Sequence, residues 1–401
     1  MFKKLMLSLL FLLMAGILIA CNESETSSSE GGTESNANRE VLEIGLVGPL
    51  SGGGAAWGLP LQYGVEMAVK EVNDNGGLDI GGTNYNVELI TYDDQYIGDE
   101  SVSAANRLVF EDNVNYIFGT VGSSGVLGMQ TITEDNEVLL MTNSYGTEAL
   151  SPDKPFTFRG LPTNLEWGSE VITYMSEEFP DAKKVAFISP NDESGWQVQK
   201  NAEEDFLELD YEIVANEFPE RETQDYNPIL TKVLNTEPDI IAFGGTSPGE
   251  MGVAMNQARA LGYEGLFTGF GGPAIQEILS IAGDNAEDFI YYAQTDIESP
   301  EAQELINNYG QEYEKEFLEV APDWYDAATM LFAAMEETGT LDTSEVAETL
   351  RNMDGFEGLA GEMSWTGEEH YGINQQLTKP VIVGQVIDGK AVIVDVREIK
   401  E

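Results

Sequence analysis

The chain has 401 residues, and 71 acidic residues against 19 basic ones give it a net charge of −52. Nucleic acid is not expected as a partner, because phosphate backbones are recognised through basic side chains. Cys21 is the only cysteine, which excludes internal disulfides and cysteine-based metal sites.

The first forty residues predict an exported protein held by a lipid. A short basic segment and an apolar run end at Ala20, directly before Cys21. The run is too short for a typical membrane span and fits a signal peptide over 1–20. We expect Cys21 to carry the lipid anchor, although an ordinary signal sequence is the alternative. The Ser-, Gly- and Glu-rich stretch 21–40 predicts a flexible tether.

From Val41 onward, strand-like and helix-like stretches alternate. In the first block the expected strands are 41–47, 87–92, 116–118 and 138–141, and the expected helices are 61–72 and 101–110. After Pro162 a second block has expected strands at 184–188, 240–243 and 266–268, and expected helices at 196–209 and 250–261. Such alternation predicts parallel sheets covered by helices. Two blocks exceed one ordinary domain, so we expect two α/β lobes of similar design.

The last third of the chain follows a different pattern. Helical stretches at 301–318 and 326–337 precede two apolar runs at 380–386 and 389–394. The runs are separated by Asp388-Gly389, a dipeptide typical of tight hairpin turns.

The acidity has two competing explanations. It could steer a cationic ligand, or it could solvate the protein in salty surroundings, where charge repulsion is screened. The acidic residues are spread along the whole chain, which favours a halophilic or alkaliphilic source.

Several segments share their order and spacing with a known family. They are 44–52, 66–73 with the glycine pair at 76–77, 92–94, 119–124, 158–159 and 325–328. Through them the chain resembles the branched-chain amino acid and amide branch of the type I periplasmic-binding family, over residues 43–396.

The resemblance implies two doubly wound, Rossmann-like α/β lobes joined by a three-stranded hinge. The chain would cross between the lobes near Leu161, Gln294 and Gln375. The expected N-terminal lobe is 41–161 plus 295–375, and the expected C-terminal lobe is 162–294 plus 376–401.

The same resemblance implies an extracytoplasmic solute-binding lipoprotein on the outer face of the cytoplasmic membrane. It would act as a monomer, without cofactor or metal, and deliver an amino acid or a related small polar acid or amide to an ABC permease complex. A ligand-sensing subunit for a membrane receptor and a surface adhesin are alternatives. A carboxylate-based hydrolase is a further one, although His370 is the only histidine and no nucleophile elbow is present.

Helix N-termini beyond strand ends are natural sites for a ligand carboxylate. Ser123 follows a strand and opens a helix, and by resemblance it is the carboxylate-binding serine, the alternative being a plain N-cap. Thr147 resembles a ligand-contacting threonine, with Tyr145 and Gly146 lending backbone groups, or else it is a turn residue. Asp94, at a strand end, could orient the loops, but we expect it to be a solvated acid.

Further candidates would cover the ligand. Trp57 lies among glycines in an expected loop, where the family often has an aromatic residue. Ser194 and Trp196 lie where the second lobe contributes a lid, Thr246 follows another second-lobe strand, and Phe270 would add aromatic surface.

One departure from the family concerns the ligand's ammonium. Relatives that bind branched-chain amino acids often place an acid after the strand that here ends at Thr268, but 269–273 contains none. Either Asp192, Glu193 or Asp296 replaces it, or the ligand has no ammonium group.

Overall fold

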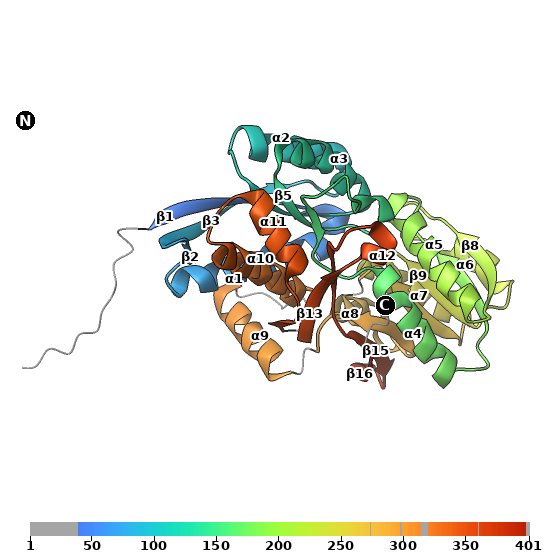
Figure 1. The fold of residues 1–401 in the computed structure, drawn as a ribbon. Coiled ribbons are helices and arrows are strands. Elements are labelled where there is room, and N and C mark those ends of the chain that lie inside the picture. The colour runs from blue at the N-terminus through green and yellow to red at the C-terminus, as the bar shows by residue number, and fades with distance from the viewer. Residues whose placement is uncertain (1–38, 273, 297–298, 314–319, 360, 398–401) are drawn as a thin grey trace, which may run out of the picture. The chain divides into compact units, whose positions relative to one another are not determined.

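The computed structural model describes residues 39–272, 274–296, 299–313, 320–359 and 361–397. The predicted signal peptide, most of the tether and Cys21 lie outside these residues. Strands and helices alternate through the described part of the chain, which confirms the predicted α/β class (Figure 1). No helix in this part combines the length and apolarity that a membrane span requires.

A nine-stranded sheet has the order β12-β13-β14-β6-β5-β4-β1-β3-β2. Its strands are β1 (Glu40–Gly48), β2 (Leu78–Ile80), β3 (Thr83–Asp93), β4 (Tyr116–Val121), β5 (Leu139–Asn143), β6 (Thr157–Arg159), β12 (Phe356–Gly358), β13 (Gly361–Thr366) and β14 (Gln376–Thr378). The strands from β3 to β14 in this order are parallel, and β2, β12 and β13 pair antiparallel at its ends. The parallel centre is buried on both faces, which explains why β4 is apolar almost throughout.

Helices cover both faces of this sheet. They are α1 (Ala55–Asp74), α2 (Gly98–Phe110), α3 (Ser123–Thr133), α10 (Ala321–Thr338) and α11 (Thr343–Asn352). Helices α1 and α10 lie side by side and bury Leu61, Val65 and Trp324 in one core. Helices α2 and α3 bury Leu108 and Met129 in a separate core on the other face. This is a doubly wound arrangement.

A seven-stranded sheet has the order β16-β15-β11-β10-β9-β7-β8. Its strands are β7 (Lys184–Ile188), β8 (Glu212–Glu217), β9 (Ile240–Gly244), β10 (Leu266–Phe270), β11 (Phe289–Ala293), β15 (Val381–Ile387) and β16 (Lys390–Arg397). Its helices are α4 (Asn164–Glu178), α5 (Glu193–Glu208), α6 (Asn227–Leu234), α7 (Pro248–Ala260) and α8 (Ile275–Ala282). Helices α4 and α5 pack on one face, and α6, α7 and α8 pack on the other. The two sheets confirm the predicted two-lobe fold.

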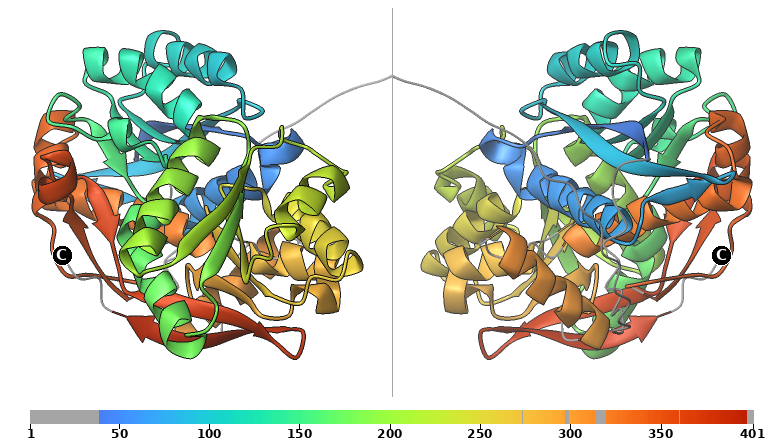
Figure 2. Two further views of the ribbon diagram at one scale, coloured as in Figure 1. Left: turned by 90° about the vertical axis from the view of Figure 1, so that its right-hand side faces the viewer. Right: turned by 90° about the vertical axis from the view of Figure 1, so that its left-hand side faces the viewer.

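The two sheets take their strands from interleaved parts of the sequence. Figure 2 shows the red hairpin β15–β16, from the end of the chain, beside green elements from its middle. Because β14 belongs to the nine-stranded sheet, the chain passes to the other sheet between Thr378 and Val381. Lys379, in this passage, forms a buried ion pair with Asp323. The remaining elements are α9 (Pro300–Tyr313), α12 (Glu368–Tyr371) and the 3-10 turns η1 (Gly52–Gly54), η2 (Glu134–Asn136), η3 (Thr147–Ala149) and η4 (Gly283–Ala286).

Two local predictions can be compared directly with the structure. The hairpin at Asp388-Gly389 is confirmed, with positive φ of 51° and 71° at its two central residues. The expected glycine loop around Trp57 was wrong, because α1 already begins at Ala55. Gly58 is needed for close packing, since a Cβ there would lie 2.1 Å from the Pro49 carbonyl oxygen.

Candidate functional site

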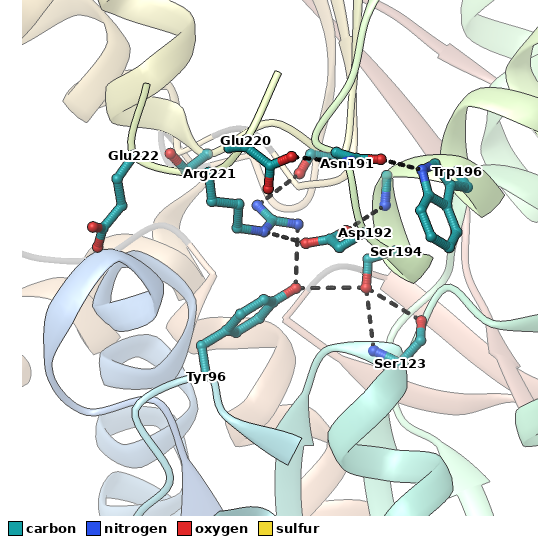
Figure 3. A network of polar contacts seen from close by, with 12 residues as sticks. Tyr96, Ser123, Asn191, Asp192, Ser194, Trp196, Glu220, Arg221 and Glu222 are labelled. Atoms are coloured by element: carbon teal, nitrogen blue, oxygen red, sulfur yellow. Dashed lines mark hydrogen bonds and ion pairs between the residues drawn. The ribbon is translucent and has the colours of Figure 1, made fainter. Parts of the chain in front are cut away.

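Two serines from different sheets meet where strands end. Ser123 begins α3 after β4, and Ser194 lies in the first turn of α5 after β7. The Ser194 Oγ accepts a hydrogen bond from the Ser123 N–H over 3.2 Å, and the two hydroxyl oxygens are 3.3 Å apart (Figure 3). Both serines are buried. The carboxyl ends of the two sheets therefore face each other, which is where open α/β sheets bind ligands.

A cavity lies next to this serine pair. Its lining consists of aromatic, small and neutral polar residues: Trp57, Tyr96, Val121, Gly122, Asn143, Tyr145, Ser194, Val198, Gly245, Gly271, Gly272, Gln294, Val320 and Trp324. Burial raises the pKa of the Tyr96 and Tyr145 phenols, so both hydroxyls stay neutral at physiological pH. Within the described ranges, no three His, Cys, Asp or Glu side chains gather as metal ligands would.

Arg221 packs against the rings of Trp57 and Tyr96, which form an aromatic wall of the cavity. Its guanidinium lies 5.4 Å from the Trp57 ring centroid and 5.0 Å from that of Tyr96, and the two rings are 5.6 Å apart. It also pairs with Asp192 and donates to the Gly245 carbonyl over 3.2 Å. Arg221 follows β8 in the seven-stranded lobe, whereas Trp57 and Tyr96 belong to the other lobe. The cation–π contacts therefore connect the two lobes.

Asp94 supports the loop that carries Tyr96. The prediction of a solvated acid was wrong, because Asp94 is 1% exposed. Its carboxylate accepts hydrogen bonds from the Tyr96 N–H (3.0 Å), the Ser101 hydroxyl (2.8 Å) and the Thr120 hydroxyl. Burial raises its pKa, although these donors oppose the shift.

The predicted first-lobe residues lie at or near the cavity. Trp57 and Tyr145 line it, and Ser123 lies one residue beyond the lining Gly122. Gly146 is turned to other partners: its N–H donates to Ser144 Oγ, and its carbonyl accepts from Arg159. Thr147 begins the turn η3 and is not part of the lining.

Of the predicted second-lobe residues, only Ser194 lines the cavity. Trp196 is 52% exposed and donates its indole N–H to Asn191 Oδ1 over 3.3 Å. The Thr246 hydroxyl donates to the Ile188 carbonyl over 3.1 Å. Phe270 points into the core beneath α4 and α5, where its ring stacks 5.6 Å from Trp167. These three side chains are committed to other contacts.

The lining residues that the sequence did not point to include Tyr96, Asn143, Gln294 and Trp324. Gln294 carried one signal, its position at an expected lobe crossing. Trp324 carried no such signal, because a tryptophan in an apolar helix is expected to lie in the hydrophobic core.

Comparisons with known proteins agree with this geometry. A family profile described as "Periplasmic binding protein" matches residues 41–391. The chain is 27% identical to the leucine-, isoleucine-, valine-, threonine- and alanine-binding protein of Pseudomonas aeruginosa, over 78% of this chain and 82% of that protein. It is 24% identical to the Leu/Ile/Val-binding protein of Citrobacter freundii, over 81% of this chain and 86% of that protein.

Two solved structures have a similar fold at 24% sequence identity. The leucine-binding protein LivK from Thermotoga maritima has a TM-score of 0.78, with coverage of 89% of this chain and 98% of that chain. LivJ from Streptococcus pneumoniae, in complex with isoleucine, has a TM-score of 0.75, with coverage of 89% and 99%.

Proposed function

Because the chain belongs to the periplasmic binding protein family, we propose that it binds an amino acid or a related small polar acid or amide and delivers it to an ABC importer. The cavity between the carboxyl ends of the two sheets carries this proposal, since it combines aromatic walls with a few polar groups. The relatives named as binding branched-chain amino acids support the ligand class.

We assign the carboxylate end of the ligand to Ser123. The N-terminus of α3 offers backbone N–H groups and the positive end of a helix dipole. The Ser194 hydroxyl now accepts from the Ser123 N–H, and a ligand carboxylate would take its place as acceptor. Binding then requires the lobes to separate and close again, as in a hinge motion. Trp57 and Tyr145 would cover the rest of the ligand.

The proposed setting is the outer face of the cytoplasmic membrane, with Cys21 lipidated and the protein acting as a monomer beside its permease. Apolar residues before a single cysteine support this, although they lie outside the described part of the chain. Replacing Cys21 with alanine should release the protein or leave it unprocessed. A variant that is still processed and lipid-labelled would contradict the anchor.

A thermal-shift screen tests the binding function. The mature chain with Cys21→Ser is mixed with amino acids, amides and small organic acids, and at least one should raise Tm by mass action. Trp57→Ala should abolish the shift, whereas Trp196→Ala should keep it, because only Trp57 lines the cavity. A screen without a single stabilising compound would contradict the proposal. Uptake by cells carrying the neighbouring permease then separates delivery from sensing.

A further inference from the structure

The cavity offers hydrogen bonds but no negative charge. Among the described residues that line it, none carries a charged side chain, and the polar ones are hydroxyls and amides such as Asn143 and Gln294. Two buried atoms of the lining residues have no hydrogen-bond partner in the described structure, the indole Nε1 of Trp57 and the Oδ1 of Asn143. The indole N–H can donate to a carboxylate or amide oxygen of a ligand, and the amide oxygen can accept from an N–H or O–H group.

Three acids near the cavity, Asp94, Asp192 and Asp323, have partners in the described structure. Asp94 accepts three hydrogen bonds from its own lobe. Asp192 accepts from the Gly195 N–H over 2.9 Å and pairs with Arg221. Asp323 pairs with Lys379 through Oδ1, while its Oδ2 has no partner among the described residues. None of the three lines the cavity, and two of them, Asp192 and Asp323, are each paired with a cation.

The second-lobe wall has no room for a side chain at Gly271. Gly245, Gly271 and Gly272 present backbone to the cavity. A Cβ on Gly271 would lie 2.8 Å from the Gly245 Cα, and its φ of +125° disfavours any other residue. Behind the aromatic wall, Arg221 is paired with Asp192, so the two side chains together add no net charge beside the cavity.

From these observations we infer that the ligand carries no ammonium group. It is a small carboxylic acid or carboxamide with an uncharged body that lies against the aromatic rings, not a zwitterionic amino acid. A buried ammonium without an anionic partner is strongly disfavoured, or must lose its proton. The inference rests on the proposed function and narrows its ligand class.

Matched pairs of ligands test the inference by calorimetry. Leucine is compared with 4-methyl-2-oxopentanoate, and phenylalanine with 3-phenylpropanoate, so that the carbon skeleton stays the same. The compound without nitrogen should bind at least about tenfold more tightly. Tighter binding of the amino acid would overturn the inference and leave the proposed function intact. If no acid, amide or amino acid binds, the proposed function itself fails and the inference with it.

A designed charge provides a second test. Gln294→Glu places a carboxylate on the cavity wall with little change in shape, and it should shift the preference toward the amino acid by about tenfold. Gln385→Glu is the matched control, because Gln385 is equally buried but bonded to Tyr174, away from the lining. An unchanged preference in Gln294→Glu would count against the inference.

Discussion

The Ser123 N–H donates a hydrogen bond to the Ser194 hydroxyl oxygen over 3.2 Å, and the two residues belong to helices on different sheets. A third hydroxyl, that of Ser144, lies 3.3 Å from the Ser123 Oγ. The serines thus form a small neutral cluster at the point where a ligand carboxylate is proposed to bind. Ser194 supplies an acceptor to a helix N-terminus that would otherwise be buried without one.

Ser123→Ala should weaken binding of the proposed ligand. The variant removes one hydroxyl donor and keeps the backbone N–H, so we expect a loss of about 1 kcal/mol, or roughly fivefold in Kd. Calorimetry with the best ligand from the screen measures this loss. Ser176→Ala is the control, because its hydroxyl donates to the Thr173 carbonyl on α4, away from the cavity lining. Equal affinities for the two variants would contradict the role of Ser123.

Lys379→Met should destabilise the fold strongly. Lys379 and Asp323 are 1% and 2% exposed, and removing the cation leaves a buried carboxylate, at a cost of about 3–5 kcal/mol. Urea unfolding measures the change. Lys70→Met breaks a solvent-exposed pair with Asp74 and should cost no more than about 0.5 kcal/mol. Similar losses in both variants would show that the buried ion pair contributes no more to the free energy of unfolding than the exposed one.

Stability should depend on the ionisation of Asp205. Burial raises the pKa of this carboxyl to about 7, and its Oδ2 has no partner among the described residues. The folded pKa exceeds the unfolded value, so the native state holds the proton more tightly, and this group lowers stability as pH rises from about 4 to 7.

Asp205→Asn should remove this pH dependence. The free energy of unfolding of the variant relative to the unmodified protein should rise between pH 5 and 8. Exposed Asp153→Asn serves as the control and should show no such trend. Parallel stability curves for Asp205→Asn and the unmodified protein would argue that Asp205 remains charged in the fold.

Salt should stabilise the protein. Loss of the signal peptide with its two lysines changes the net charge from −52 to −54. The excess acidic side chains repel one another in the compact folded state. At 1 M salt the screening length falls to about 3 Å, so Tm should increase by several degrees from dilute buffer. Sodium and potassium chloride should act alike if screening dominates. A flat or falling Tm would contradict this explanation of the acidity.

The elements of the fold could be predicted from the sequence because their signals are local. The strand at 184–188 was predicted with its observed bounds, since a short apolar run between polar residues is typical of a buried strand. The hairpin at Asp388-Gly389 was equally explicit, because positive φ at both turn residues favours this dipeptide. The serine that opens α3 was also found, from its place after a buried strand.

The composition of the cavity was decided by the tertiary structure. Tyr96, Asn143, Gln294 and Trp324 meet there although they are far apart in the chain, and no local pattern marks them as neighbours. Phe270 was assigned to the site from its position at a strand end, but its side chain turns to the face under α4 and α5. From the sequence, Asp94 was expected to be solvated, but in the fold three hydrogen-bond donors surround its carboxylate. Backbone periodicity determines which elements form, whereas packing between distant segments determines which side chains share a cavity and what charge remains in it.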